Sequence, residues 1–250
     1  QISLSGKQPW SPNSPKLYTV VSRVSYNGIL VDCVRTKFGI RTVRFDKDNG
    51  FFLNGEHFAI LGANVHQDHA GWGDAVTRAG IQRDIRMIKE CGMNTIRGSH
   101  YPHHPYFAQV CDEEGILFWS EMCFWGTGGD KRDGFWVASA YPPKKEDQKD
   151  FEKSCLDQLE EIIRSQRSHP SIICWSMCNE VFFTDDPEGR DFLNLLPKCY
   201  KDKYRPAYNN FVVQDENGEF RSAIGSFYND MTVGDEQIKA CCIGNVAVGK

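Results

Sequence analysis

The sequence contains no apolar run approaching the roughly 20 residues that a membrane-spanning helix needs, so no transmembrane segment is expected. It also has no basic stretch of the kind that follows a phosphate backbone, and its net charge of −4 is mild, so nucleic acid is not an expected partner. The opening QISLSGKQPW has neither a charged segment nor an apolar core, so no signal peptide is expected. These absences indicate a soluble chain, from either the cytoplasm or the periplasm, and leave its oligomeric state open.

Closely spaced cysteine pairs of the kind found in zinc sites and redox motifs are also missing, although the chain has 10 cysteines. Most of these cysteines lie in apolar helical or strand patterns, where cysteine behaves as a small buried hydrophobic residue. We therefore expect reduced thiols in the core rather than a disulfide framework, and neither a metal nor another cofactor.

Residues 1–45 carry the pattern of β structure. Leu17–Val24 alternates apolar and polar positions, Asn27-Gly28 is a turn signal, and Gly39–Phe45 alternates again. Two or three strands cannot bury their own faces. This segment is therefore interpreted as the C-terminal strands of a β-sandwich.

Two further segments border these strands. The proline-rich stretch Trp10–Pro15 is expected to be a rigid approach along the surface. The polar stretch Asp46–Gly50 is expected to mark the boundary with a second domain, residues 46–250.

From Phe51 onward, short apolar strands alternate with amphipathic helices. The expected strands are Phe58–Asn64, Asn94–Arg97, Ile116–Trp119 and Ile172–Ser176. The expected helices are marked by Ile81, Ile85 and Ile88 before a stop at Gly92, by Pro105–Glu114 before Gly115, and by Phe151, Cys155, Leu159 and Ile162. Four consecutive strand–helix units predict parallel strands with right-handed crossovers. The pattern fits either a doubly wound α/β sheet or half of a (β/α)8 barrel.

Polar side chains gather where these strands end. They are His66 after the first strand, Arg97 and His100 at the second, Glu121 at the third, and Asn179 and Glu180 at the fourth. In a barrel the active site is built on that face. A lone polar residue there is more often a loop residue, and Arg97 could be a purely structural ion-pair partner. Tryptophans in the same segments suit either sugar faces or the core: Trp72, Trp119, Trp125 and Trp175.

Four motifs, in the right order and spacing, resemble glycoside hydrolase family 2, the β-galactosidase, β-glucuronidase and β-mannosidase family. WSPNSPKLYTV with DCVRTKFGIRTV resembles the exit from that family's immunoglobulin-like domain, and FFLNGEHFAILGANVHQDH its first barrel strand. NTIRGSHYPHHPYF resembles the second strand, and SHPSIICWSMCNE the acid/base signature. The resemblance runs from about Trp10 to Asp202 and implies a (β/α)8 TIM barrel, incomplete or truncated here, after the end of an immunoglobulin-like β-sandwich. HQDHAGWGDAV with FWSEMCFWG is most similar to the β-galactosidase-like branch.

The resemblance implies a retaining exo-β-glycosidase that hydrolyses terminal β-linked sugars. Glu180 would protonate the leaving oxygen and then activate water as a base. Asn179 would bond the 2-hydroxyl of the sugar. The other substrate-binding residues implied are His66 and His100 against the sugar, Arg97 beneath the site, and Glu121 in a role that stays open.

Two departures from the family pattern change the expectations. The loop Met122–Gly129 lacks the Glu and the His that help hold magnesium in large bacterial β-galactosidases, so magnesium is not carried over. Nothing after Glu180 matches the second glutamate, the family's nucleophile, and residues 206–250 stay unassigned. Glutamates in polar surroundings are Glu188, Glu216, Glu219 and Glu236. The chain is therefore expected to be a fragment or remodelled, and not to turn over glycosides by itself.

Two alternatives remain open. One is a non-catalytic carbohydrate-binding relative, or an inactive fragment, that keeps the sugar pocket without the nucleophile. The other is a metal-dependent hydrolase that uses His66, His69, His100 and a carboxylate, although a His-x-x-His spacing in a loop is weak evidence for a metal site.

Overall fold

The computed structural model describes residues 5–46, 48–124, 141–142 and 144–179, together with the backbone of four short strands. These strands form two antiparallel pairs: β10 (Val212–Gln214) with β11 (Phe220–Ser222), and β12 (Met231–Val233) with β13 (Glu236–Ile238). The segment 206–250, which the sequence left unassigned, therefore contains two hairpin pairings. Across the part of the chain that is described, no helix is long and apolar enough to cross a membrane.

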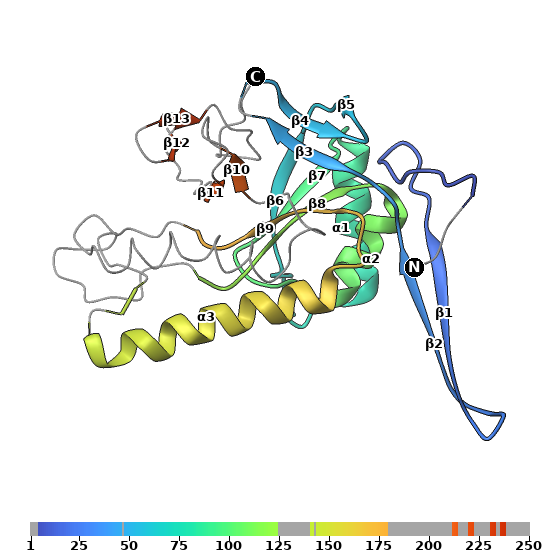
Figure 1. The fold of residues 1–250 in the computed structure, drawn as a ribbon. Coiled ribbons are helices and arrows are strands. Elements are labelled where there is room, and N and C mark those ends of the chain that lie inside the picture. Colours follow the sequence, from blue (N-terminus) through green and yellow to red (C-terminus); the bar gives the residue numbers. More distant parts are fainter. Residues whose placement is uncertain are drawn as a thin grey trace.

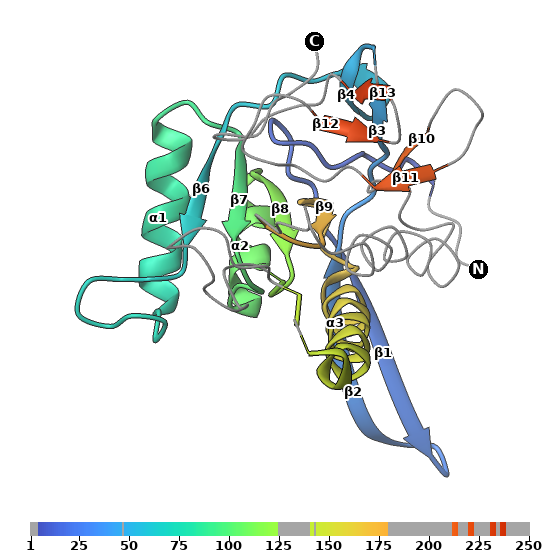
Figure 2. The same cartoon turned by 90° about the vertical axis from the view of Figure 1, so that its left-hand side faces the viewer.

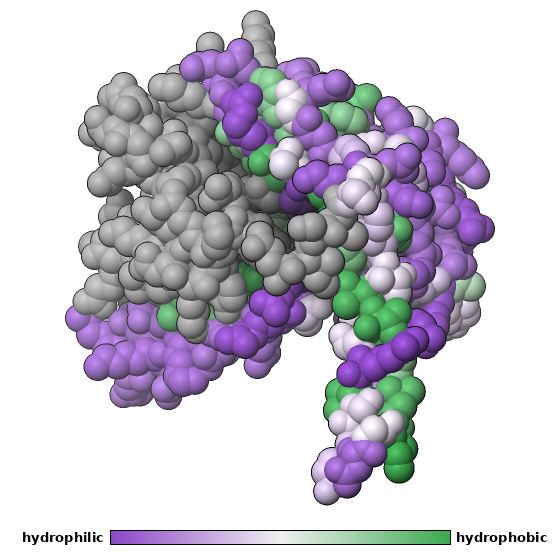
Figure 3. Space-filling view, turned by 45° about the vertical axis from the view of Figure 1, so that its right-hand side comes forward, coloured by the Kyte–Doolittle hydropathy of each residue, from purple (hydrophilic) through white to green (hydrophobic). Residues whose placement is uncertain are grey.

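A long hairpin of β1 (Tyr18–Tyr26) and β2 (Ile29–Phe38) extends away from the rest of the molecule (Figure 1). Its turn is the Asn27-Gly28 pair, and both residues have positive φ, as a two-residue hairpin turn requires. Figure 3 shows apolar side chains gathered along this hairpin. Exposed members include Val24, Ile29, Leu30, Val31 and Val34. Two strands alone leave such side chains uncovered.

The predicted strand Gly39–Phe45 is wrong in its first half. Residues 39–42 form no strand, and β3 begins at Val43. The reason is a contact with a distant part of the chain, because Arg41 donates hydrogen bonds to the backbone carbonyls of Pro170 and Ile172. A Cβ on Gly39 would lie 2.5 Å from the Pro170 ring, so the chain passes too close there for a side chain.

Trp10 is completely buried, so the expectation that Trp10–Pro15 lies along the surface is wrong for its first residue. The Trp10 backbone N–H donates to the Ile40 carbonyl (2.7 Å), and Nε1 donates to the Asp112 carbonyl (2.9 Å). Trp10 therefore anchors the segment before the hairpin to the part of the chain around Asp112.

A small antiparallel sheet joins β3 (Val43–Asp46), β4 (Gly50–Leu53) and β5 (Glu56–His57). Asp46 pairs with Gly50, so the polar stretch between them is the turn of a hairpin. The predicted division between residues 45 and 46 falls inside β3, and it stays a prediction.

The main sheet has four parallel strands in the order β6 (Gly62–His66), β7 (Thr95–Ser99), β8 (Leu117–Glu121) and β9 (Ile172–Ser176). The predicted order and parallel direction are confirmed. The first strand begins at Gly62 rather than Phe58, whereas β9 has the predicted bounds.

Three helices connect these strands: α1 (Arg78–Glu90), α2 (Pro105–Glu114) and α3 (Lys145–Gln166). α1 and α2 lie side by side against the sheet (Figures 1 and 2). The Thr77 side chain caps α1 by accepting from the Gly80 backbone N–H, and buried Ile81 and Ile85 supply its inner face. Pro105 begins α2, and Gly115 ends it in the left-handed conformation with φ 73°.

Some of the cysteines lie in the core between the sheet and the helices. Cys111, Cys155 and Cys174 are buried, and burial raises the pKa of each thiol, to about 12 for Cys155. All seven cysteines in the described ranges are free thiols, as expected, but Cys91 and Cys123 are exposed rather than in the core.

Candidate active site

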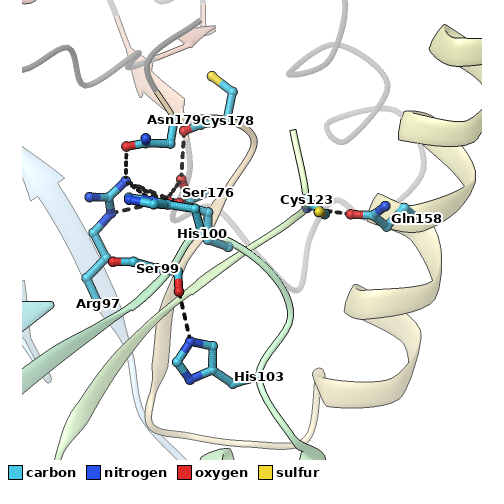
Figure 4. Close-up of polar contacts among 10 residues, drawn as sticks. Arg97, Ser99, His100, His103, Cys123, Gln158, Ser176, Cys178 and Asn179 are labelled. Atoms are coloured by element: carbon cyan, nitrogen blue, oxygen red, sulfur yellow. Dashed lines mark hydrogen bonds and ion pairs between the residues drawn. The ribbon is translucent and has the colours of Figure 1, made fainter. Parts of the chain in front are cut away.

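Five of the predicted site residues come together at the carboxyl end of the parallel sheet. In a parallel sheet, residues in register share a face, and the pairs Asn64–Arg97, His66–Ser99 and Glu121–Ser176 are in register. Figure 4 shows Arg97, His100, Ser176 and Asn179 gathered around one point. The five residues come from the ends of four strands, β6, β7, β8 and β9, as barrel active sites do.

Arg97 is the centre of this cluster, with a side chain that is 5% exposed. Its Nε and Nη2 donate to Glu121 Oε2 (3.1 and 2.9 Å), and Nη2 also reaches Asn179 Oδ1 (2.8 Å). Arg97 therefore does form the buried ion pair that the structural interpretation expected. The same guanidinium also positions a residue next to the predicted acid, which an ion pair alone would not do.

Glu121 is completely buried, and protein groups occupy both of its carboxylate oxygens. Besides Arg97, Oε1 contacts His100 Nδ1 (2.6 Å) and Oε2 accepts from the Ser176 hydroxyl (2.6 Å). A carboxylate offers about four lone-pair sites. These donors account for them, so a sugar hydroxyl would have to displace one of these partners to reach Glu121.

The two histidines lie closer to the solvent than Glu121 does. His66 is exposed, and its ring meets the His100 ring edge to face at 5.1 Å between centroids. Partial desolvation, with the neighbouring His100 and Arg97 charges, lowers the pKa of His66 below its usual value. A neutral His66 can donate a hydrogen bond from one ring nitrogen and accept one at the other.

Asn179 follows β9 by three residues and is 4% exposed. Its backbone N–H donates to the Phe124 carbonyl (3.0 Å), and its side-chain oxygen faces Arg97. The neighbouring Glu180, the predicted acid/base, lies outside the described residues. So do Trp125 and Glu188.

His69 does not join the cluster through any described contact. Its Nε2 contacts Asp84 Oδ2 of α1 (2.6 Å), and a Cβ on Gly80 would touch the His69 ring. Within residues 5–46, 48–124 and 144–179, no group of three His, Cys, Asp or Glu side chains is arranged to hold a metal ion. The geometry of the described residues gives the metal-hydrolase alternative no ligand set.

The tryptophans divide between core and surface. Trp175 is 2% exposed and belongs to the core, whereas Trp72 is 57% exposed on the loop after β6. Trp119 is partly buried, and its indole N–H has no hydrogen-bond partner among the described residues.

Two buried residues near the cluster were missed by sequence reasoning. Ser176 bonds Glu121, and its signal is its place as the last residue of β9, in register with Glu121. His103 Nε2 donates to the Ser99 carbonyl (3.3 Å), and the His103 ring packs against Phe107 (4.8 Å between ring centroids), below the cluster in Figure 4. Burial lowers the pKa of His103 to about 4.

Parallel βα units that gather polar groups at the carboxyl ends of their strands are typical of a β/α-barrel enzyme. Comparison with known families agrees. The family model described as "Glycosyl hydrolases family 2, TIM barrel domain" matches residues 44–238, and the model "Glycosyl hydrolases family 2" matches residues 1–41. The chain belongs to glycosyl hydrolase family 2, and the match extends past Asp202, where the recognisable motifs end.

The chain is similar to proteins named β-glucuronidase and to proteins named β-galactosidase. A β-glucuronidase of Bacteroides fragilis is 36% identical over 194 residues, which cover 77% of this chain and 26% of the relative. The β-galactosidase BgaC of Bifidobacterium adolescentis is 33% identical over 178 residues, which cover 69% of this chain and 16% of the relative. Among solved structures, β-glucuronidase 3 of Bacteroides uniformis superposes with a TM-score of 0.68 and 31% identity, covering 83% of this chain and 25% of the other.

The chain thus spans about a quarter or less of the length of these relatives. The chain and these relatives share the fold and the family. The activity and the substrate of the whole protein belong to the proposal that follows.

Proposed function

We propose that the protein is a retaining exo-β-glycosidase that removes terminal β-linked sugars, with Glu180 as the general acid/base. The observation that carries this proposal is the Arg97–Asn179 contact, because it holds the residue directly before Glu180 at the carboxyl end of β9. Family membership supports it, since the similar relatives are named β-glucuronidase and β-galactosidase.

In the proposed mechanism, Glu180 protonates the leaving oxygen while a second carboxylate attacks the anomeric carbon. Glu180 then removes a proton from the water that hydrolyses the glycosyl-enzyme. Asn179 bonds the sugar 2-hydroxyl, and His66 and His100 contact other hydroxyls. The nucleophile stays unassigned, and a carbohydrate-binding relative without it stays the alternative.

The sugar is proposed to be a neutral hexose, as in the β-galactosidase-like branch. Apart from Arg97, the described residues at the strand ends include no lysine or arginine in residues 62–77, 95–104, 117–124 and 172–179. Glu121 already neutralises Arg97. The described part of the site therefore offers no spare positive charge for the carboxylate of a uronic acid, and β-galactosides are expected to be cleaved faster than β-glucuronides.

The test is Glu180→Gln in the complete protein. We expect kcat/KM for an alkyl β-galactoside, which has a poor leaving group, to fall about 100-fold or more. The value for dinitrophenyl β-galactoside should change far less, because a good leaving group departs without a proton.

The matched control is Glu113→Gln, which makes the same substitution elsewhere. Glu113 lies on α2 and forms a partly exposed ion pair with Lys37. This control should leave kcat/KM unchanged for both substrates. Equal slowing of both substrates by Glu180→Gln would assign Glu180 a role other than the acid.

A further inference from the structure

Glu121 has contacts that a residue binding the sugar directly does not need. Its side chain is 0% exposed, and three residues from three different elements donate to it: Arg97 of β7, His100 of the following loop, and Ser176 of β9. The residues around it become more exposed toward the solvent, from Arg97 at 5% to His100 at 11%, with His66 exposed. Glu121 thus lies behind the residues that face a ligand.

Rigid placement of the Arg97 guanidinium is one consequence. Nε and Nη2 both bond Oε2, and Nη2 is also 3.2 Å from Oε1, so the planar group cannot rotate without losing several bonds. In this orientation Nη2 reaches Asn179 Oδ1 at 2.8 Å. Arginine has donors and no acceptor, so the Asn179 side chain must present its oxygen to Arg97. Its NH2 group is thereby directed to other partners.

The protonation of the His100 ring is a second consequence. Nδ1 lies 2.6 Å from Glu121 Oε1, a distance that requires a proton on Nδ1 when the carboxylate is ionised. The longer contact between Nδ1 and Arg97 Nη2, at 3.2 Å, joins two donors that share one carboxylate. The bond from Nδ1 also fixes the orientation of the His100 ring against Glu121.

We propose that Glu121 is a positioning residue: it fixes the amide orientation of Asn179, through Arg97, and the ring orientation of His100, through Nδ1. The Asn179 NH2 group is then the donor that the site presents to a sugar hydroxyl, which can accept. This inference rests on the proposed function for the identity of the ligand. It replaces direct sugar binding by Glu121 with action through its neighbours.

The experiment uses Glu121→Gln in the complete protein and the parent and 2-deoxy forms of one sugar. Gln keeps the shape of Glu but removes the charge that holds Arg97, and its NH2 group takes the place of one acceptor oxygen, so the guanidinium is held less firmly. Calorimetry should show a roughly 10- to 100-fold weaker affinity for galactose. The affinity for 2-deoxygalactose should change far less, because that sugar lacks the hydroxyl that Asn179 is proposed to bond. The same split is expected in kcat/KM for the two nitrophenyl β-glycosides.

Ser176→Ala is the second variant, because Glu121→Gln leaves a buried arginine without its counter-charge and can unfold the domain. Removing the Ser176 hydroxyl keeps the charge and deletes one bond to Oε2. It should give the same split with a smaller amplitude. Glu113→Gln is again the control and should leave both affinities unchanged.

Equal losses for the parent and the 2-deoxy sugar would overturn the inference, since a purely structural role would weaken both alike. Unchanged affinities in both variants would overturn it as well. Binding without turnover in the wild type would contradict the proposed glycosidase activity and leave the role of Glu121 measurable. A wild type that binds neither sugar would contradict the galactose site on which the inference rests.

Discussion

At the scale of single residues, the contribution of the buried Arg97–Glu121 ion pair to folding stability does not explain its presence. Burying two charges costs desolvation energy that their attraction only partly offsets, and apolar replacements of similar volume are often as stable. Removing one partner of such a pair, in contrast, typically lowers the folding stability by about 3–5 kcal/mol. Retaining such a pair at the end of a sheet fits a site that needs a fixed guanidinium, as the contact with Asn179 indicates.

His103 gives a residue-scale prediction about pH. Burial lowers its pKa to about 4 in the folded protein, whereas an unfolded histidine has a pKa near 6.5. The unfolded state therefore binds the proton first as the pH falls. The contribution of His103 is fully present above pH ~6.5 and is lost as the pH falls toward ~4, by at most roughly 3 kcal/mol.

The measurement is the free energy of unfolding in urea between pH 7 and 4, for the wild type and two variants. His103→Gln should flatten the decline, because it removes the buried group that cannot take up a proton. His57→Gln changes an exposed histidine and should leave the slope as in the wild type. Identical slopes in all three proteins would contradict the burial argument.

At the scale of elements, the end of α2 depends on the segment that precedes the hairpin. Gly115 has φ 73°, and a Cβ there would lie 2.3 Å from the Pro12 carbonyl oxygen. Gly92, after α1, has φ 80° and open space around it. Both glycines have a positive φ, but Gly92 is exposed, whereas Gly115 is buried against the Pro12 backbone.

Replacing each glycine by alanine separates strain from the clash. Gly92→Ala should cost about 1–2 kcal/mol, the penalty of a left-handed residue with a side chain. Gly115→Ala should cost at least about 1 kcal/mol more, because Pro12 or the helix end must also move. Urea unfolding measures both. Equal losses would indicate that the contact between Pro12 and Gly115 does not contribute to stability.

The elements also show which features the sequence could predict. Pro105 and Gly115 are local signals for the two ends of α2, and that helix has the predicted bounds. Phe58 and Ile60 looked like a strand because they are apolar, but they pack against the core before β6 begins at Gly62. β2 was missed because charges such as Asp32 and Arg35 interrupt its pattern in an exposed hairpin.

The candidate site was partly predictable for a similar reason. Parallel strands bring their carboxyl ends together, so His66, Arg97 and Glu121 could be assigned to one place before the register was known. The partners of Glu121 could not. A serine at a strand end, such as Ser176, has no distinctive pattern, and its role depends on the pairing of β8 with β9.

At the scale of the whole molecule, the segments on either side of the hairpin contact the part of the chain that holds the parallel sheet. The Trp10 indole reaches Asp112, the Arg41 side chain reaches Pro170, and Gly39 lies against the Pro170 ring. The described parallel sheet has β6 and β9 at its edges, and the chain spans about a quarter or less of the length of the relatives cited. Tests of the proposed chemistry therefore use the complete protein.

The most direct test of the account is azide rescue of Glu180→Ala in the complete protein. Without its base, the variant should form a glycosyl-enzyme from dinitrophenyl β-galactoside and hydrolyse it slowly. Azide needs no base, so adding it should raise kcat roughly 10-fold or more and yield β-galactosyl azide, identified by NMR. An α-configured azide would make Glu180 the nucleophile. An absence of both rescue and azide product would contradict the assignment of Glu180 as the acid/base of a retaining enzyme.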